Sequence, residues 1–323
     1  MNILFCSVGR RGELLKDFRK SVSDGSVFVA TDNSKYAPAL YFADKQYIVP
    51  RIDAQEYIDI LLDICRKESI QAVATFIDPE IELLAKNRSR FEELGITLLI
   101  PSEETARLSY DKYQMYQYLT AHNISTTKTW GTIEEFKNES GVFPVFVKPR
   151  TGSGSVGARK INSMVDLEVA VQNDPTLIIQ EFMDCTDLDA DVYIDTISHQ
   201  AVSAFTKYKI ETRIGGASKT ISFKDDHLFD FIREICSLFE FNGAVDMDFF
   251  RRGDQYYLSE VNPRFGGAYL HAYGAGVDFI KLIENNIKGI ENKPCFGDYD
   301  DGVVMMMYDS VVIKKADELA TEE

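Results

Sequence analysis

The chain has 323 residues, of which 45% are hydrophobic and 12% aromatic, a composition typical of a soluble globular protein with more than one lobe. Its formal net charge of -16 argues against a general nucleic-acid or membrane surface, which would be basic. The five cysteines are scattered and odd in number, so we expect neither a disulfide framework nor a structural zinc site, and a cytoplasmic location is expected. No window has the roughly 18 uninterrupted apolar residues of a membrane span.

The first hundred residues alternate between strand-like and helix-like segments. Strands are expected at residues 2–8, 27–31, 47–49, 72–76 and 97–100, and helices at 12–23, 54–68 and 79–94. Such alternation predicts a Rossmann-like lobe with a parallel sheet and helices on both faces. Gly9 and Asp32 would then lie at the carboxyl ends of strands, where open α/β sheets bind ligands, although a tight turn and a helix cap also explain them.

The rest of the chain predicts two α+β units. Residues 101–130 are mostly helical in pattern. Strands are expected at 143–148, 157–161, 177–181, 189–196, 201–209, 219–223 and 303–312, with helices at 165–172, 226–239 and 277–290. The expected fold class is therefore α/β and α+β, with domains at residues 1–100, 101–185 and 186–323. The final residues, KKADELATEE, are polar and expected to fray.

A glycine-rich segment follows the strand that ends at Lys148. The residues Gly152, Ser153, Gly154, Ser155 and Gly157 fit the G-x-G-x-x-G pattern of dinucleotide sites. That pattern requires a helix to open at the last glycine, whereas residues 157–161 have strand character. A strand–loop–strand flap that lays backbone N–H groups over phosphates is the better interpretation, with the Lys148 ammonium reaching the same phosphates. A mobile polar hairpin is the alternative.

Acidic and amide side chains lie on two neighbouring apolar segments near the C-terminus. Asp246 and Asp248 precede a polar turn around Asp254, and Glu260 and Asn262 follow it. Because residues two apart on a strand share a face, a hairpin centred near Asp254 would place Asp248 opposite Glu260 and Asp246 opposite Asn262. Carboxylate and amide oxygens are the ligands that Mg²⁺ prefers when it also holds phosphates. A hairpin edge with solvated acids is the alternative.

The strand at 177–181 ends in residues that suit an adenine base. Gln180, Glu181, Phe182 and Met183 combine hydrogen-bonding groups with apolar ones. Asp187, Asp189 and Asp191 lie just beyond them, and two of these could accept hydrogen bonds from ribose hydroxyls. For Glu181 taken alone, the exposed end of a strand is the better explanation.

In this order, these elements resemble the ATP-grasp superfamily, and within it the carbamoyl-phosphate-synthase-like and carboxylate–amine ligase branches. The resemblance covers roughly residues 100 to 290. It rests on six motifs: Asp111-Lys112, Phe143–Pro149, Thr151–Gly157, Gln180–Met183, Val245–Phe250 and Glu260–Gly267. The preceding lobe is similar to the N-terminal domain of that family.

The resemblance implies an ATP-binding, Mg²⁺-dependent enzyme. Lys112 and Lys148 would bind ATP phosphates under the Gly152–Gly157 loop, while Gln180 to Met183 receive adenine and Asp187 or Asp189 receives ribose. Asp248, Glu260 and Asn262 would hold one or two Mg²⁺ ions, with Mn²⁺ as a substitute and Asp246 as the alternative first ligand. Arg264 would face the transferred phosphoryl group, and Lys148 and Arg264 are the expected catalytic residues.

The implied reaction activates a carboxylate as an acyl phosphate, which an amine or ammonia then displaces. The expected partners are thus a small carboxylate and a small amine, with no nucleic acid and no membrane. The oligomeric state stays open, although a homodimer is common among similar proteins. Two alternatives stay open: a kinase or carbamoyl-phosphate-forming subunit that works with a partner, and an ATP-binding sensor without turnover.

Overall fold

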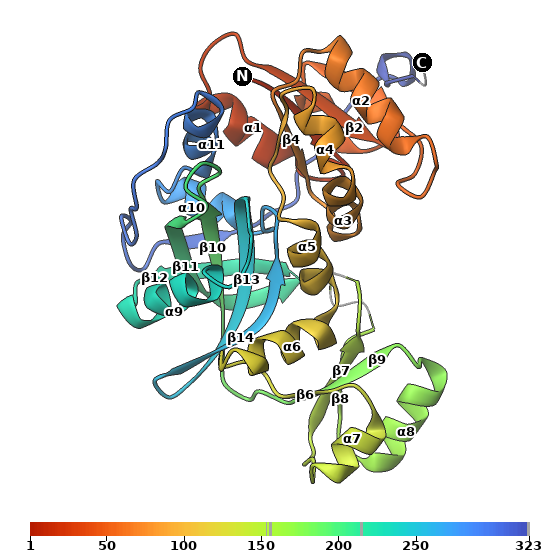
Figure 1. Ribbon diagram of the computed structural model, residues 1–323, viewed down its shortest axis with the longest axis vertical. Helices are drawn as coiled ribbons and strands as arrows, with labels where there is room; N and C mark the ends of the chain where they lie inside the picture. The colour runs from red at the N-terminus through yellow and green to blue at the C-terminus, as the bar shows by residue number, and fades with distance from the viewer. Residues whose placement is uncertain (153, 155–156, 214–215, 322–323) are drawn as a thin grey trace.

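Three sheets follow one another along the long axis of the protein (Figure 1). The computed structural model describes residues 1–152, 154, 157–213 and 216–321. Within them, an N-terminal parallel lobe lies at one end of the molecule, a four-stranded sheet at the other, and a six-stranded sheet between the two. In the described part of the chain no helix is long and apolar enough to cross a membrane.

The N-terminal lobe is a five-stranded parallel sheet in the order β3-β2-β1-β4-β5. Its strands are β1 (Asn2–Cys6), β2 (Val27–Asp32), β3 (Lys45–Ile48), β4 (Ala72–Thr75) and β5 (Thr97–Leu98), and its helices are α1 (Gly12–Ser21), α2 (Tyr57–Lys67), α3 (Asp78–Lys86) and α4 (Arg88–Glu92), with a 3-10 turn at Pro38–Phe42. Alternate residues of β1 enter different cores: Ile3 and Phe5 lie on one face, Leu4 and Cys6 on the other. The parallel pairing of all five strands confirms the predicted sheet, and its burial on both faces is typical of parallel sheets.

The helix predicted at residues 79–94 is two helices in the structure. Helix α3 ends at Lys86 and α4 begins at Arg88. Between them the Asn87 amide donates to the Leu83 carbonyl at 2.9 Å, so its side chain satisfies a carbonyl group at the end of α3. The prediction of one continuous helix was wrong at this residue.

The six-stranded sheet has the order β14-β13-β10-β11-β12-β15, and all its pairings are antiparallel. Its strands are β10 (Thr186–Ile194), β11 (Ala201–Arg213), β12 (Gly216–Phe223), β13 (Gly243–Arg252), β14 (Gln255–Asn262) and β15 (Val304–Met306), and the helices nearby are α9 (Asp226–Cys236), α10 (Tyr269–Gly274) and α11 (Phe279–Ile287). The last strand is shorter than the predicted 303–312, because Met307 makes the final bond to Ser218 and the chain then leaves the sheet. A 3-10 turn at Ala316–Glu318 stands in the tail that we expected to fray.

The four-stranded sheet has the order β6-β9-β7-β8. Its strands are β6 (Thr129–Trp130), β7 (Val145–Pro149), β8 (Arg159–Ile161) and β9 (Leu177–Glu181), with α7 (Ile133–Asn138) and α8 (Met164–Asn173). A separate core around Trp130, Val145 and Leu167 stabilises it. Three residues of the preceding helices α5 (Glu103–Tyr110) and α6 (Lys112–Ala121), namely Leu108, Met115 and Leu119, enter instead the core that the six-stranded sheet shares with the N-terminal lobe. The domain limits at residues 100 and 185 stay a prediction.

The β13–β14 hairpin has the register that the sequence predicts. Asp246 pairs with Asn262 and Asp248 with Glu260. The turn itself lies at Gly253 and Asp254, half a residue from the expected centre. The strand pairs next to the turn, from Arg252–Gln255 to Phe249–Leu258, are therefore shifted by one residue from the predicted register. A bulge between Phe249 and Asp248 adds one residue to β14, at Ser259, and restores the predicted pairs.

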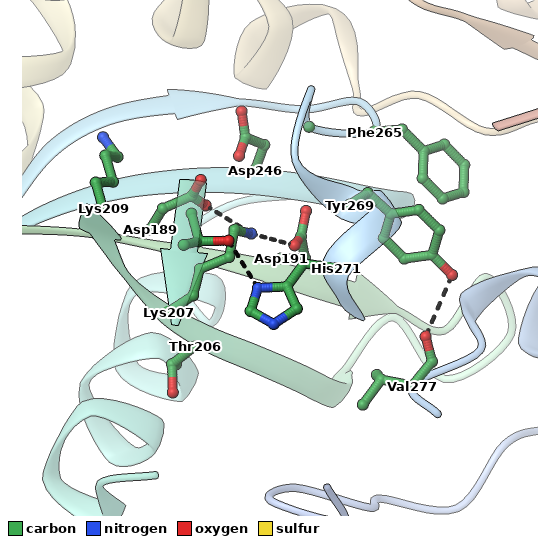
Figure 2. A network of polar contacts seen from close by, with 12 residues as sticks. Asp189, Asp191, Thr206, Lys207, Lys209, Asp246, Phe265, Tyr269, His271 and Val277 are labelled. Carbon is green, nitrogen blue, oxygen red and sulfur yellow. Dashed lines mark hydrogen bonds and ion pairs between the residues drawn. The ribbon is translucent and has the colours of Figure 1, made fainter. Parts of the chain in front are cut away.

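His271 of α10 belongs to the packed interior of the middle sheet (Figure 2). Only 2% of its surface is exposed. Its Nδ1 lies 2.7 Å from the Thr220 hydroxyl, and its ring meets Phe205 edge-on. Burial, aided by the charge of Lys207, lowers the pKa of His271 to about 4. The folded protein therefore holds this imidazole neutral.

We predict a pH-dependent loss of stability that His271 causes. Because its folded pKa lies below the ordinary value near 6.5, the unfolded chain takes up a proton that the folded chain rejects. Stability is thus full above about pH 6.5 and falls as the pH drops toward 4. Melting temperatures measured at about pH 7.5 and 5.5 should fall less in His271→Gln than in the wild type, whereas the exposed His227→Gln should follow the wild type. An equal fall in all three proteins would contradict the prediction.

Candidate active site

A cavity of about 650 Å³ lies between the four-stranded and the six-stranded sheets. It contains most of the residues that the sequence singled out, although they are far apart in the chain. Those that line it are Lys112, Lys148, Gly152, Gln180, Glu181, Phe182, Met183, Asp187, Asp248 and Glu260. The structure therefore brings the expected phosphate, adenine and metal residues to one place.

Two lysines meet the Glu260 carboxylate at this cavity. Lys148, on β7, lies 3.3 Å from Glu260, and Lys112, at the start of α6, lies 3.9 Å from it. The Lys112 ammonium also donates to the Gly152 carbonyl at 2.6 Å, which connects α6 to the beginning of the glycine loop. Burial lowers the pKa of Lys112, and Glu260 opposes that shift. Two cations facing one carboxylate leave positive charge for an anionic ligand.

The N-terminus of α6 is fixed by its capping residue. The Asp111 side chain accepts from the backbone N–H groups of Tyr113 and Gln114, as a helix N-cap does. Arg150, just beyond β7, forms an ion pair with the same carboxylate at 2.7 Å. Asp111 therefore sets the position of its neighbour Lys112 relative to β7.

A third lysine at the cavity was not predicted. The Lys209 ammonium of β11 contacts Asp248 and lies 2.9 Å from Asp187. Burial by itself lowers the pKa of Lys209, but the two carboxylates raise it above the ordinary value. Burial also raises the pKa of Asp187, against the influence of Lys209. The ammonium thus occupies the position between two carboxylates that a metal cation would compete for.

The residues expected around adenine are a mixture of apolar and paired polar groups. Phe182 and Met183 line the cavity together with Phe146 and Phe250. Glu181 also lines it, and its carboxylate pairs with Arg252 at 2.7 Å. Gln180 is 6% exposed and donates to Thr129 at 2.9 Å. Flat apolar side chains beside strand ends suit an aromatic base.

The glycine loop lies between two residues that line the cavity, Gly152 and Ala158. Gly152 lines the cavity, whereas Gly154 and Gly157 are exposed and outside its lining. Ser153 and Ser155 lie outside the described residues. The loop joins β7 to the antiparallel strand β8, which confirms the predicted strand–loop–strand arrangement and agrees with our rejection of a dinucleotide motif.

Arg264 lies beside the cavity rather than in its lining. Its guanidinium forms an ion pair with Asp78, in which a terminal nitrogen donates to Oδ2 at 3.2 Å and Nε lies 2.9 Å from Oδ1. The guanidinium also lies 3.5 Å from Asp246. Asp78 begins α3 in the N-terminal lobe. Arg11, a partly buried cation of that lobe, donates to the Gly266 carbonyl at 2.9 Å, and burial, together with Arg264, lowers its pKa to about 10. These contacts join the N-terminal lobe to the segment that follows β14.

Next to this segment, a row of buried aspartates surrounds Lys207 (Figure 2). The ammonium lies 3.2 Å from Asp189 and also contacts Asp191. Asp189 is 5% exposed and does not line the cavity, unlike Asp187 two residues before it. Asn262 likewise lies outside the lining, where its amide donates to Asp246 at 3.4 Å.

The residues that sequence reasoning missed are Lys207, Lys209 and the lobe-bridging pair of Asp78 with Arg264. The two lysines lie two apart on β11, and Asp187, Asp189 and Asp191 alternate in the same way on β10. Their alternation was a usable signal, because it places charged groups on one face of each strand. No three His, Cys, Asp or Glu side chains in the described ranges converge on one metal-sized point.

We predict that Gly266 is required for the position of Arg264. A methyl group at Gly266 would lie 2.6 Å from Asp246 Oδ1 and 2.9 Å from Asp191 Oδ1, closer than atoms can pack, so the loop would shift. Gly266→Ala should lower the ATP-dependent turnover that the sequence resemblance implies at least ~10-fold, since misplacement of about 1 Å has large effects on catalysis. The matched control is Gly274→Ala, whose added methyl meets nothing within 4 Å. Equal activity of the two variants would contradict this assignment.

Two known protein families together match most of the chain. Residues 3–99 match the PylC-like N-terminal domain, and residues 109–268 match the ATP-grasp domain. A curated relative, the formate-dependent phosphoribosylglycinamide formyltransferase of Psychromonas ingrahamii, is 23% identical over 263 residues, which are 74% of this chain and 63% of the relative. The chain thus spans less than two thirds of the length of that relative.

Solved structures share the fold at low identity. The N5-carboxyaminoimidazole synthetase of Staphylococcus aureus, solved with ADP, has a TM-score of 0.73 at 16% identity over 91% of this chain and 78% of its own. The biotin carboxylase domain of Hydrogenobacter thermophilus 2-oxoglutarate carboxylase, a dimer solved with MgADP, ADP and bicarbonate, has a TM-score of 0.72 at 18% identity over 94% and 73%. With an ATP-grasp domain that follows a PylC-like N-terminal domain, the chain belongs to the ATP-grasp superfamily.

Proposed function

We propose that the chain is an ATP-dependent ligase that activates a small carboxylate as an acyl phosphate for attack by an amine or ammonia. The observation that carries the proposal is the cavity in which Lys112, Lys148 and Glu260 converge between the two sheets. The membership in the ATP-grasp superfamily supports ATP as the phosphoryl donor.

In the proposed complex, the nucleotide lies across the cavity. Its phosphates bind Lys112 and Lys148, with backbone N–H groups of the glycine loop above them. The base packs beside Phe182 and Met183, which line the same cavity. Of the two candidates for ribose, Asp187 is favoured, because it lines the cavity while Asp189 is buried against Lys207.

The carboxylate and amide groups of the hairpin fit a divalent cation. Asp248 and Glu260 line the cavity, and each already holds an ammonium group, Lys209 and Lys148 respectively. Asp248, Glu260 and Asn262 would hold Mg²⁺, which would neutralise charge on the triphosphate. Asp246 is the weaker candidate, since it is buried beside Arg264 and outside the lining. One or two ions remain part of the proposal.

The acceptor carboxylate is proposed to enter from the side of the N-terminal lobe. Arg264 forms an ion pair with Asp78, which lies just beyond the carboxyl end of β4, and open α/β sheets bind ligands at the carboxyl ends of strands. Its guanidinium suits the charge that develops on a transferred phosphoryl group.

The chemistry then needs positioning and charge neutralisation rather than a covalent nucleophile. A carboxylate oxygen attacks the γ-phosphorus and the bond to the β-phosphate oxygen breaks, which releases ADP. The amine nitrogen attacks the acyl carbon, the bond to phosphate breaks, and inorganic phosphate leaves with loss of a proton from the nitrogen. Lys148 and Arg264 are the proposed catalytic residues, because they would stabilise negative charge during the first step.

Phosphate release over a panel of carboxylates and amines tests this proposal. We expect ADP and phosphate to form only when both a carboxylate and an amine are present, with an amide as the third product in mass spectra. Turnover with the carboxylate alone, giving a stable phosphorylated product, would establish a kinase. Tight ATP binding without turnover over the panel would establish a sensor, and either result would overturn the ligase assignment.

Glu260→Gln provides the sharpest single-residue test. The change keeps the shape and removes the charge that faces Lys148 and Lys112. We expect at least ~100-fold less Mg²⁺-dependent turnover, the scale seen when one electrostatic group of an active site is removed, with the fold retained in circular dichroism. The matched control is Glu168→Gln, which removes a surface partner of Lys137 at 2.9 Å and should leave turnover unchanged. Activity of wild-type size in Glu260→Gln would refute the metal assignment.

A further inference from the structure

The end of the chain carries a long exposed apolar strip. From residue 304 to 313, six large apolar side chains are 38–87% exposed: Val304, Met306, Met307, Tyr308, Val311 and Ile313. Elsewhere in the described chain, exposed large apolar residues are scattered along the sequence. Scattered apolar residues are normal on a protein surface, but a contiguous run of them indicates a contact with another molecule.

The strip includes an edge of the middle sheet. Strand β15 is the last in the order of the six-stranded sheet, and one side of it pairs with β12. The Val303 carbonyl and the Met307 N–H bond to β12, so by alternation the backbone groups of Val304 and Met306 face the other way. No strand within the described residues pairs with that outer side. An edge of this kind can pair with another strand.

Charge is distributed unequally along the same segment. Two exposed acids, Asp300 and Asp301, precede the apolar strip, and two exposed lysines, Lys314 and Lys315, follow it. If the segment met a copy of itself in antiparallel orientation about its centre, Asp301 would lie opposite Lys314 and Asp300 opposite Lys315. The same register sets Val304 opposite Val311. A parallel arrangement would bring like charges together, which destabilises strand pairs.

We propose that the segment from Asp300 to Lys315 is the interface of a symmetric homodimer, in which two copies pair antiparallel along this strip. Such a contact is self-complementary, as a two-fold interface requires. We infer a second copy as the partner because the segment is complementary to itself: its two acids would face the two lysines of the other copy, and its apolar side chains would face the same side chains. The two basic residues also offset the repulsion between chains of net charge -16.

The strip connects two lobes within each protomer. Strand β15 belongs to the middle sheet, and beyond it Lys314 lies over the ring of Tyr41, at 6.0 Å, in the N-terminal lobe. Between them, Asp309 forms ion pairs with Arg10 at 3.6 Å and with Arg213 at 3.3 Å. Pairing of two copies would therefore hold the N-terminal lobe and the middle sheet of each protomer against one rigid surface.

Charge reversal with rescue tests the proposal. Sedimentation equilibrium of the whole chain from about 1 to 100 µM should show a monomer–dimer equilibrium. Lys314→Glu with Lys315→Glu should raise the dissociation constant at least ~10-fold, and so should Asp300→Lys with Asp301→Lys. The protein with all four changes should return to within ~3-fold of the wild type, because its pairs are opposite in sign again.

Two further variants complete the test. Val304→Asp with Val311→Asp should also give monomers, while reversal of two exposed lysines outside the strip, Lys35→Glu with Lys293→Glu, changes the net charge equally and should leave the dimer intact. Circular dichroism checks that each variant is folded. A wild type that stays monomeric at 100 µM, a dimer insensitive to the charge reversals, or a quadruple variant that is not rescued would each overturn the proposal.

Discussion

Burial of aspartates on one face of the middle sheet is the constraint on which this structure depends. Alternation along β10 and β13 directs five aspartates to the same face, and pairing across the strands sets Asp189 beside Asp248 and Asp191 beside Asp246. Asp189, Asp191 and Asp246 are buried. A buried carboxylate without a partner costs several kcal/mol, so the fold has to bring cations to this face. Lys207 and Lys209 come from the adjacent strand β11, and Arg264 comes from the segment after β14.

The same cations join the separate parts of the chain. Arg264 satisfies Asp246 of the middle sheet and Asp78 of the N-terminal lobe, so the two lobes share one ion-paired cluster. On the other side, Glu260 satisfies Lys148 of the four-stranded sheet. A charged group that compensates a buried charge in one part of the chain thus also positions the neighbouring part. A substitution among these ion-paired residues should therefore affect both the arrangement of the lobes and the reaction.

Much of this architecture could be predicted from short-range sequence patterns. The alternation of strands and helices, and acidic residues at every second position of a strand, can both be recognised from residues close together in the sequence. The pairs Asp246–Asn262 and Asp248–Glu260 were predicted from the assumed centre of the hairpin turn. The real turn lies half a residue away from that centre, and the bulge at Ser259 compensates for the difference, so the predicted pairs form. The contact of Asp78 with Arg264 could not be predicted in this way, because it spans 186 residues and depends on how two lobes pack. Lys209 is intermediate: its spacing from Lys207 was visible, but its carboxylate partners were not.

The charge of the whole chain is a poor guide to the charge of its cavity. Against a net charge of -16, the cavity lining has three lysines, Lys112, Lys148 and Lys209, and four acids, Glu181, Asp187, Asp248 and Glu260. Since Glu181 is paired with Arg252 outside that set, the remaining lysines and acids balance. A bound triphosphate would then add uncompensated negative charge, which the near-neutral lining alone does not offset. The requirement for a divalent cation in the proposed reaction follows from this balance.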